Sequence, residues 1–178
     1  DPLCTNATLL TVSADTTCNA TAGSLYGANS ETNADSCGNP NNKAYDVWYA
    51  FAATNATQII DIKRQTPQSG NFIASLFDAC GGKRIACGAP AGPGSLSFYE
   101  TNLIPTHTYY VRVYGGETQL PNPNAKFNIC VRRAPPAPVN DDCSKAISLK
   151  VDTVCNAIPG TVAYATQSSP NPPAACGA

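Results

Sequence analysis

The sequence YDVWYAF at residues 45–51 decides the fold. Large apolar side chains stand at every second position of this stretch, at residues 45, 47, 49 and 51. Period-two spacing is typical of a β-strand that turns one face to a core. The sequences TYYVRVY at 108–114 and KFNICVR at 126–132 have the same pattern, and we find no segment of ten or more residues with helical periodicity. The chain is therefore predicted to be all-β.

Working outward from these stretches, short runs rich in β-branched and aromatic residues alternate with turns rich in Gly, Pro and Asn. The runs predict strands near residues 8–13, 18–27, 45–53, 57–64, 72–78, 83–87, 95–100, 108–114 and 126–132. Eight or nine short strands with turns between them favour an antiparallel, jelly-roll-like β-sandwich.

The chain also contains an internal repeat. Residues 4–12 align with 143–151, residues 15–20 align with 152–157, and three cysteines recur in order: Cys4, Cys18 and Cys37 meet Cys143, Cys155 and Cys176. The proline-rich stretch 134–142 between the copies favours an extended, semi-rigid linker. We therefore expect a complete sandwich at 1–133, a linker at 134–142, and the first strands of an incomplete second copy at 143–178. Either further polypeptide completes that copy, or the copy packs against another molecule.

Composition narrows the class of protein. The formal net charge is −1 and only 13% of residues are charged, so nothing favours nucleic acid or an anionic membrane as partner. No run of 18 apolar residues predicts a membrane span. The nine cysteines stand singly, with one histidine and no Cys-x-x-Cys pair, which favours structural disulfides over zinc. These features indicate an extracellular, disulfide-stapled protein.

Cysteine spacing suggests a pairing but does not fix it, because six cysteines allow 15 pairings. A local bridge across the turn at Gly81-Gly82 is expected first, and the proximity of first and last strands then suggests two more. The expected bridges are Cys80–Cys87, Cys4–Cys130 and Cys18–Cys37, with Cys4–Cys18 as a rival. In the second copy we expect Cys155–Cys176, which leaves Cys143 without a partner.

Catalysis finds little support. His107 is the only histidine and lies in a turn before a strand, so we expect a solvated side chain. No Gly-x-Ser-x-Gly, Ser-x-x-Lys or His-Glu-x-x-His motif supplies a nucleophile or a metal site. We expect no enzyme and no organic cofactor. Calcium is the ion that the sequence leaves possible, with Asp35, Asp46 and Asp78 as candidate ligands because loop carboxylates suit a hard cation.

Aromatic side chains offer one candidate binding surface. Trp48, Tyr110 and Tyr114 alternate with the apolar faces of their strands, so an exposed row could stack on a polysaccharide. The alternative is that covering loops bury these three side chains.

Several segments together resemble a known family. The segments are DVWYAF at 46–51, CGG at 80–82 followed by IAC at 85–87, TYYVRVYG at 108–115, FNICV at 127–131, and NDDC at 140–143. The chain resembles the tandem sandwich modules of large secreted Bacteroidota proteins, which are similar to the bacterial pre-peptidase C-terminal domain. This resemblance implies a jelly-roll fold and a place at the cell surface, in an adhesin, in a filament, or beside a secreted enzyme.

Modification sites follow from the same resemblance. Asp15-Thr16-Thr17 and Asp152-Thr153-Val154 are similar to the Bacteroidota O-glycosylation pattern and occupy equivalent places in the two copies. Thr16 and Thr153 are therefore candidate glycosylation sites, although Asp-Thr also makes a good turn. We expect a structural or adhesive repeat that contacts neighbouring copies of itself. The alternative is a carbohydrate- or calcium-binding accessory module of a secreted enzyme.

Overall fold

A computed structural model describes residues 4–31, 37, 44–70, 72–88, 94–115 and 121–166. The chain divides into two compact units, 1–134 and 135–178, which are described separately. The strands of the first unit are β1 (Thr8–Leu9), β2 (Val12–Ser13), β3 (Thr21–Ser24), β4 (Ser30–Glu31), β5 (Ala44–Ala52), β6 (Gln58–Arg64), β7 (Phe72–Phe77), β8 (Arg84–Gly88), β9 (Ser95–Glu100), β10 (Thr108–Gly115) and β11 (Lys126–Arg133). Two 3-10 turns accompany them, η1 (Cys4–Asn6) and η2 (Pro67–Ser69).

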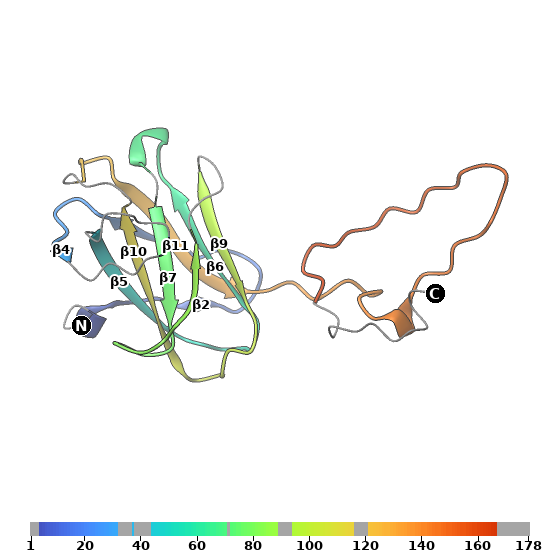
Figure 1. Cartoon of the computed structure of the whole chain (residues 1–178), viewed down its shortest axis with the longest axis horizontal. Coiled ribbons are helices and arrows are strands. Elements are labelled where there is room, and N and C mark those ends of the chain that lie inside the picture. Colours follow the sequence, from blue (N-terminus) through green and yellow to red (C-terminus); the bar gives the residue numbers. More distant parts are fainter. Residues whose placement is uncertain are drawn as a thin grey trace. The chain divides into compact units, whose positions relative to one another are not determined.

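The strands form two sheets that face each other (Figure 1). The first sheet has the order β1-β5-β10-β7-β8, with β4 also paired to β5. The second sheet has the order β2-β11-β6-β9, with β3 also paired to β11. The predicted all-β sandwich is thus confirmed, and the long strands begin and end within two residues of their predicted positions.

The N-terminal segment crosses from one sheet to the other. A single strand was predicted at 8–13, but β1 pairs in parallel with β5, whereas β2 pairs in parallel with β11. Leu10 stands at the crossing, where its N–H donates to Ala50 O at 2.8 Å and its side chain is buried. The crossing ties the two sheets together at the start of the chain, and the other strand pairs are antiparallel.

The core lies between the sheets and is built from the alternating apolar positions of β5, β6, β7, β10 and β11. Phe127 is its centre, with its ring centroid 4.9 Å from Phe72 and 6.0 Å from Tyr49. Gly23 of β3 lies directly beneath, where a Cβ atom would stand 2.2 Å from the Tyr49 hydroxyl and 2.6 Å from the Phe127 ring. A side chain at position 23 would therefore collide with the core.

Three disulfides brace the first unit, and none is a predicted pair. They are Cys4–Cys80, Cys18–Cys130 and Cys37–Cys87. The Cys80–Cys87 prediction is wrong because Cys87 lies inside β8 opposite Ser75, well away from the turn that carries Cys80. The Cys4–Cys130 and Cys18–Cys37 predictions are also wrong. Cys4 precedes β1, which pairs with β5 in the first sheet, whereas Cys18 precedes β3, which pairs with β11 in the second sheet. The rival pair Cys4–Cys18 is excluded by the same bonds.

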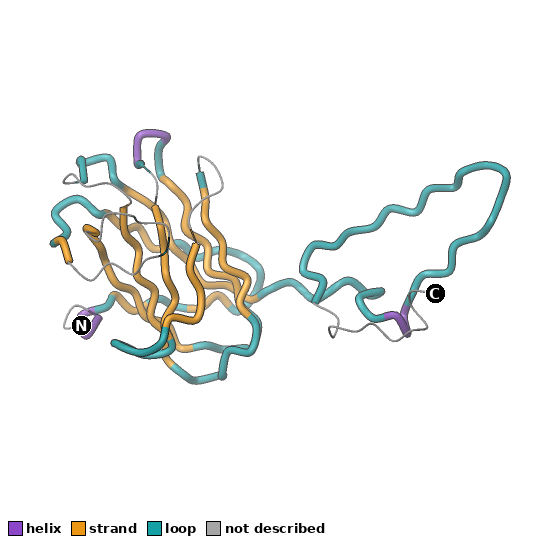
Figure 2. The backbone as a smooth tube through the Cα atoms, viewed as in Figure 1, coloured by secondary structure: helices purple, strands orange, loops and turns teal. Residues whose placement is uncertain are grey.

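The second unit has little regular structure where it is described. Residues 135–166 contain one short 3-10 helix, η3 (Cys143–Lys145), and otherwise turns and extended chain (Figure 2). Cys143 is disulfide-bonded and Cys155 is a free, exposed thiol. The predicted Cys155–Cys176 bridge is therefore wrong, because Cys155 is free, and so is the prediction that Cys143 has no partner. Cys176 lies outside the described residues. In the described part of the chain, no helix has the length and apolar character needed to cross a membrane.

Candidate functional site

Two polar clusters are buried on the outer faces of the sandwich, one on each sheet. The first cluster consists of Asp46 and Trp48 from β5 with Arg112 and Tyr114 from β10. Strand register places Arg112 opposite Trp48 and Tyr114 opposite Asp46. Because alternate residues of these strands enter the core, the four side chains share the opposite face.

An ion pair lies at the centre of the first cluster. Arg112 Nε donates to Asp46 Oδ2, and the two side chains are 3% and 0% exposed. The guanidinium carbon also stands 5.7 Å from the Trp48 ring centroid and 5.2 Å from that of Tyr114, within range of cation–π attraction. Burial raises the pKa of the Asp46 carboxyl, and the charge of Arg112 opposes that rise. The Asp46 carboxylate is therefore buried away from water, and the positive charge of Arg112 stabilises its ionised form.

Cys37 contacts this cluster from outside β5 and β10. The Tyr114 hydroxyl donates to Cys37 O at 3.1 Å, Cys37 packs on Ile73 and Tyr114, and its sulfur is bonded to Cys87 of β8. Burial raises the pKa of Tyr114. The structure thus encloses the face on which stacking was predicted.

The predicted stacking platform is not open. Trp48 and Tyr114 are buried, the Trp48 ring packs at 5.4 Å on Phe77, and Tyr110 is half-buried. These three side chains do share one face, as predicted, but the rings of Trp48 and Tyr114 are buried against other side chains of the protein. The prediction that they form an exposed row is wrong, because the sandwich buries both faces of β5 and β10.

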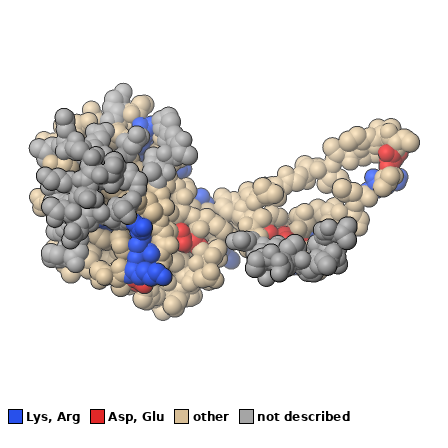
Figure 3. Space-filling model, viewed as in Figure 1, with Lys and Arg blue, Asp and Glu red and all other residues tan. Residues whose placement is uncertain are grey.

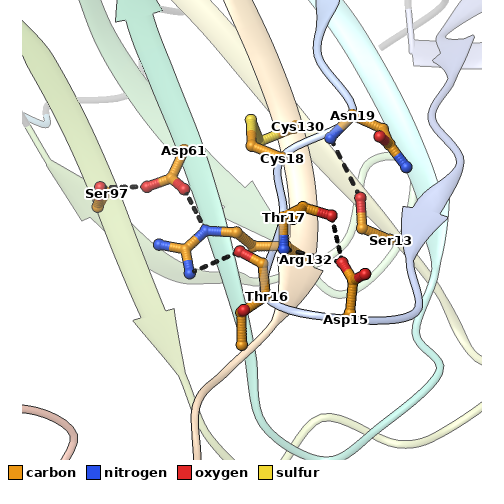
Figure 4. Close-up of polar contacts among 10 residues, drawn as sticks. All are labelled: Ser13, Asp15, Thr16, Thr17, Cys18, Asn19, Asp61, Ser97, Cys130 and Arg132. Atoms are coloured by element: carbon orange, nitrogen blue, oxygen red, sulfur yellow. Dashed lines mark hydrogen bonds and ion pairs between the residues drawn. A yellow bond between two sulfur atoms is a disulfide. The ribbon is translucent and has the colours of Figure 1, made fainter.

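The second cluster lies on the outer face of the other sheet (Figure 4). Asp61 of β6 lies between two neighbouring strands and accepts hydrogen bonds from both. Arg132 Nε of β11 donates to its Oδ2 at 2.6 Å, and Ser97 Oγ of β9 donates to its Oδ1 at 2.5 Å. Asp61 is 4% exposed, so a second carboxylate is buried beside an arginine.

The loop at residues 14–20 runs across this second cluster. Cys18 fastens it to Cys130 of β11, and Arg132 Nη1 reaches Thr16 O at 3.5 Å (Figure 4). Asp15 closes a turn within the loop by accepting from the hydroxyl of Thr17 and from its N–H at 2.8 Å. The hydroxyl bond first, and the N–H bond second, lower the pKa of Asp15. The loop is therefore pinned at several points. The side chain of Thr16, a predicted modification site, is exposed.

The remaining predicted site residues have local partners. The Asp78 carboxylate accepts from Lys83 N at 2.6 Å and caps the β7–β8 turn. His107 is exposed, as expected for a turn residue, and its ring contacts Asp78 O at 2.5 Å and the Tyr109 ring at 4.8 Å. Asp35 lies outside the described residues, and Thr153 is exposed in the second unit.

A metal centre is not formed by the residues that come closest to one. Within the described ranges, Cys18, Asp61 and Cys130 gather their ligand atoms within 4.8 Å of one another. Both sulfurs are consumed in a disulfide, and the carboxylate is paired with Arg132. The group is therefore a crosslink beside an ion pair.

The sequence reasoning missed Arg112, Ser97 and Arg132, and it treated Asp61 only as one of several scattered carboxylates. Their signal is a charged or polar residue at an outward position of a strand whose inward positions are strongly apolar. Asp46 and Arg112 form one oppositely charged pair, and Asp61 and Arg132 form the other. Pairing them requires the strand order, which local sequence does not give.

Charged side chains are sparse on the face seen in Figure 3, where most described atoms belong to uncharged residues. This agrees with the low charged fraction of the sequence. The described face therefore provides no large charged surface for a polyanionic partner.

Comparisons with known proteins give a family match and a similar solved structure. A family model named GBD_T9SS_assoc, described as "Galactose binding domain-like", matches residues 2–129. A solved structure, the pre-peptidase C-terminal domain of collagenase from Bacillus anthracis, is 14% identical, with a TM-score of 0.41 over 68% of this chain and 95% of that one. No curated protein matches the sequence. Association with T9SS, a Bacteroidota secretion system, implies a secreted or cell-surface protein. The chain therefore belongs to the T9SS-associated family of galactose-binding-domain-like proteins.

Proposed function

We propose that this chain is a load-bearing structural module of an extracellular surface protein, built to work in a tandem array with copies of itself. The observation that carries this proposal is the Cys18–Cys130 disulfide, which joins the start of the module to its last strand across a sequence separation of 112 residues. The loop at residues 14–20, fixed by this bond, lies over the second cluster, and Cys37, which is bonded to Cys87, packs against Tyr114 of the first cluster.

The disulfide shortens the covalent path through the module. A force applied between Cys4 and Ala134 runs along residues 4–18, crosses to Cys130, and leaves along residues 130–134. About 18 residues lie on this path, and at about 3.5 Å per residue they extend to roughly 6 nm. Without crosslinks the same ends could separate by roughly 45 nm. A module whose crosslinks limit its extension to roughly 6 nm suits a stalk or fibre under tension.

The contacts that bury the polar clusters on the outer faces of the two sheets support the same function. The side chains that could have recognised a ligand are engaged within the protein instead: Asp46 and Asp61 are paired with arginines, and Tyr114 donates to Cys37 O. Thr16 and Thr153 are the positions at which we expect O-linked glycans, and glycans there would add protection against proteases. Catalysis has no part in this proposal.

A carbohydrate-binding accessory role is the second candidate, and the description of the family favours it. A glycan array probed with the folded, oxidised chain separates the two functions. Specific binding to one sugar class would support recognition. The structural proposal expects no selective binding at the predicted stacking row of Trp48, Tyr110 and Tyr114, so Tyr110→Ala should leave any array signal unchanged.

Single-molecule pulling between residues 4 and 134 tests the structural proposal. The oxidised protein should release no more than roughly 6 nm of contour length. The variant Cys18→Ser/Cys130→Ser should release roughly 19 nm, because the shortest path then runs through Cys4–Cys80 and residues 80–134.

The matched control is Cys37→Ser/Cys87→Ser. This variant also loses one disulfide, but that bond lies off the shortest path, so its extension should stay at roughly 6 nm. Release of several tens of nanometres from the oxidised wild-type protein would overturn the proposal.

A further inference from the structure

The second unit reproduces local conformations of the first unit at aligned positions. η1 begins at Cys4 and η3 begins at Cys143, which is its counterpart in the repeat. Each turn closes with a backbone hydrogen bond to the cysteine carbonyl, from Ala7 N at 3.2 Å and from Ala146 N at 3.1 Å. The two segments therefore begin with the same turn.

The correspondence continues about 20 residues further along. Ala28 N donates to Leu25 O at 3.0 Å, and its counterpart Ala165 N donates to Val162 O at 3.2 Å. Within these turns, Gly27 has φ 81° and the aligned Tyr164 has φ 62°, an uncommon value for a residue with a side chain. The same backbone turn thus forms at both places, although tyrosine adopts a positive φ much less readily than glycine does.

Ser24 and Thr161 add a matching side-chain bond before the turn. Ser24 Oγ accepts from Tyr26 N, and Thr161 Oγ1 accepts from Ala163 N, both at 3.0 Å. Residues 143–166 therefore repeat the turns found among the first strands of the sandwich, but no strand forms in this stretch.

Burial separates the two copies. Leu10 and Leu25 are 4% and 2% exposed in the first unit, where β5 and the other core strands cover them. Their counterparts Leu149 and Val162 are 73% and 88% exposed. Burying apolar side chains that are this exposed is favourable, because it removes their surface from water. The first unit shows what covers them, namely the strands of residues 44–133.

The cysteines show the same difference. Cys18 is bonded to Cys130 of β11, whereas its counterpart Cys155 is an exposed free thiol. Gly23 is crowded by Tyr49 and Phe127, whereas nothing lies within 4 Å of a Cβ atom built on its counterpart Gly160. Each contact missing from the second unit is one that residues 44–133 supply in the first.

We propose that residues 143–166 bind as the first strands of a second sandwich, whose other strands carry counterparts of residues 44–133. Leu149 and Val162 enter that core, and Cys155 bonds to the counterpart of Cys130. The bond forms by thiol–disulfide exchange: two thiols lose two protons and two electrons, and a small disulfide oxidant is reduced to two thiols. This inference rests on the proposed array, because it continues the covalent load path of the first unit into a second module.

A fusion protein tests the inference by appending residues 40–133 after Ala178, so that Cys176 and Gly177 take the places of Cys37 and Gly38. In the 178-residue chain, iodoacetamide should label Cys155 fully. In the fusion refolded with oxidised glutathione, labelling should fall at least tenfold, and a peptide map should join Cys155 to the appended copy of Cys130. Gly160→Ala should leave the 178-residue chain unchanged but lower the melting temperature of the second sandwich in the fusion.

The positive control replaces residues 143–178 of the fusion with residues 4–39, which duplicates the first module. If this control folds while Cys155 of the test fusion stays reactive and Gly160→Ala has no effect, the inference is overturned. Pulling on the first unit alone reports separately on the proposed load-bearing function, because it does not involve residues 143–166.

Discussion

Replacing Arg112 with methionine should expose how much the first cluster depends on its ion pair. Methionine keeps an apolar stem of similar length but removes the charge beside Asp46, whose side chain is fully buried. Removing one partner of a buried pair costs about 3–5 kcal/mol, because the remaining charge is desolvated and uncompensated. Loss of the cation–π contacts with Trp48 and Tyr114 acts in the same direction.

The loss of unfolding free energy caused by Arg112→Met should be larger at neutral pH than at acidic pH. Burial already raises the pKa of Asp46 against the opposing charge of Arg112, so removing Arg112 should raise this pKa further. A carboxyl whose folded-state pKa is raised contributes stability below its unfolded pKa of about 4 and loses it as the pH rises through the folded value. The deficit of Arg112→Met should therefore be largest near neutral pH and shrink on acidification.

Urea unfolding of the oxidised protein at about pH 7 and about pH 5 measures this deficit. The double variant Arg112→Met/Asp46→Asn should recover most of the loss, because no buried charge remains. Arg132→Met is the matched control on the second sheet: it should cost less, because Arg132 is more exposed and Asp61 keeps its bond to Ser97. A pH-independent deficit, or one below about 1 kcal/mol, would refute the reasoning.

Three further predictions use contacts of the first unit. Gly23→Ala should cost about 1–3 kcal/mol by overpacking against the core, while Gly160→Ala in the 178-residue chain should be silent, both measured by urea unfolding. Leu10→Ala should cost about 2–5 kcal/mol and Leu149→Ala less than about 0.5, and equal effects would contradict the burial contrast. Burial raises the pKa of Tyr49 to about 12, so its stabilising contribution is present below about pH 10 and is lost as the pH rises toward 12. Tyr49→Phe should weaken that alkaline dependence in unfolding curves, and an unchanged profile would contradict it.

The strands were predictable because their signal is local. Alternating apolar residues in 45–51 and 108–114 report a core-facing strand whatever it pairs with, and the structure confirms them. The outward positions of these strands were harder to interpret. Alternation alone places Trp48 and Tyr114 on one face, but their burial depends on contacts with Phe77 and Cys37, which come from elsewhere in the chain.

The disulfides show the limit of spacing as a guide. The expectation that the start of the module meets its last strand was correct in direction, because β2 and β3 both pair with β11. The cysteine that bonds to the last strand is Cys18 and not Cys4. The reason is that the N-terminal segment first pairs with β5 and crosses to the second sheet only at Leu10. That crossing depends on tertiary packing, so the six cysteines of the first unit could not be paired from sequence.

The buried ion pairs were hidden for the same reason. Asp61 is one of several scattered carboxylates in the sequence, and nothing nearby marks Arg132, 71 residues later, as its partner. Only the antiparallel register of β6 and β11 places them side by side.

A non-reducing peptide map of the oxidised protein tests the central claim most directly. Proteolysis followed by tandem mass spectrometry should recover peptides of Cys18 joined to Cys130, with Cys4 joined to Cys80 and Cys37 joined to Cys87. This result would establish the covalent path from the second strand to the last strand. Recovery of Cys18 joined to Cys37, the pair that sequence spacing favoured, would contradict it.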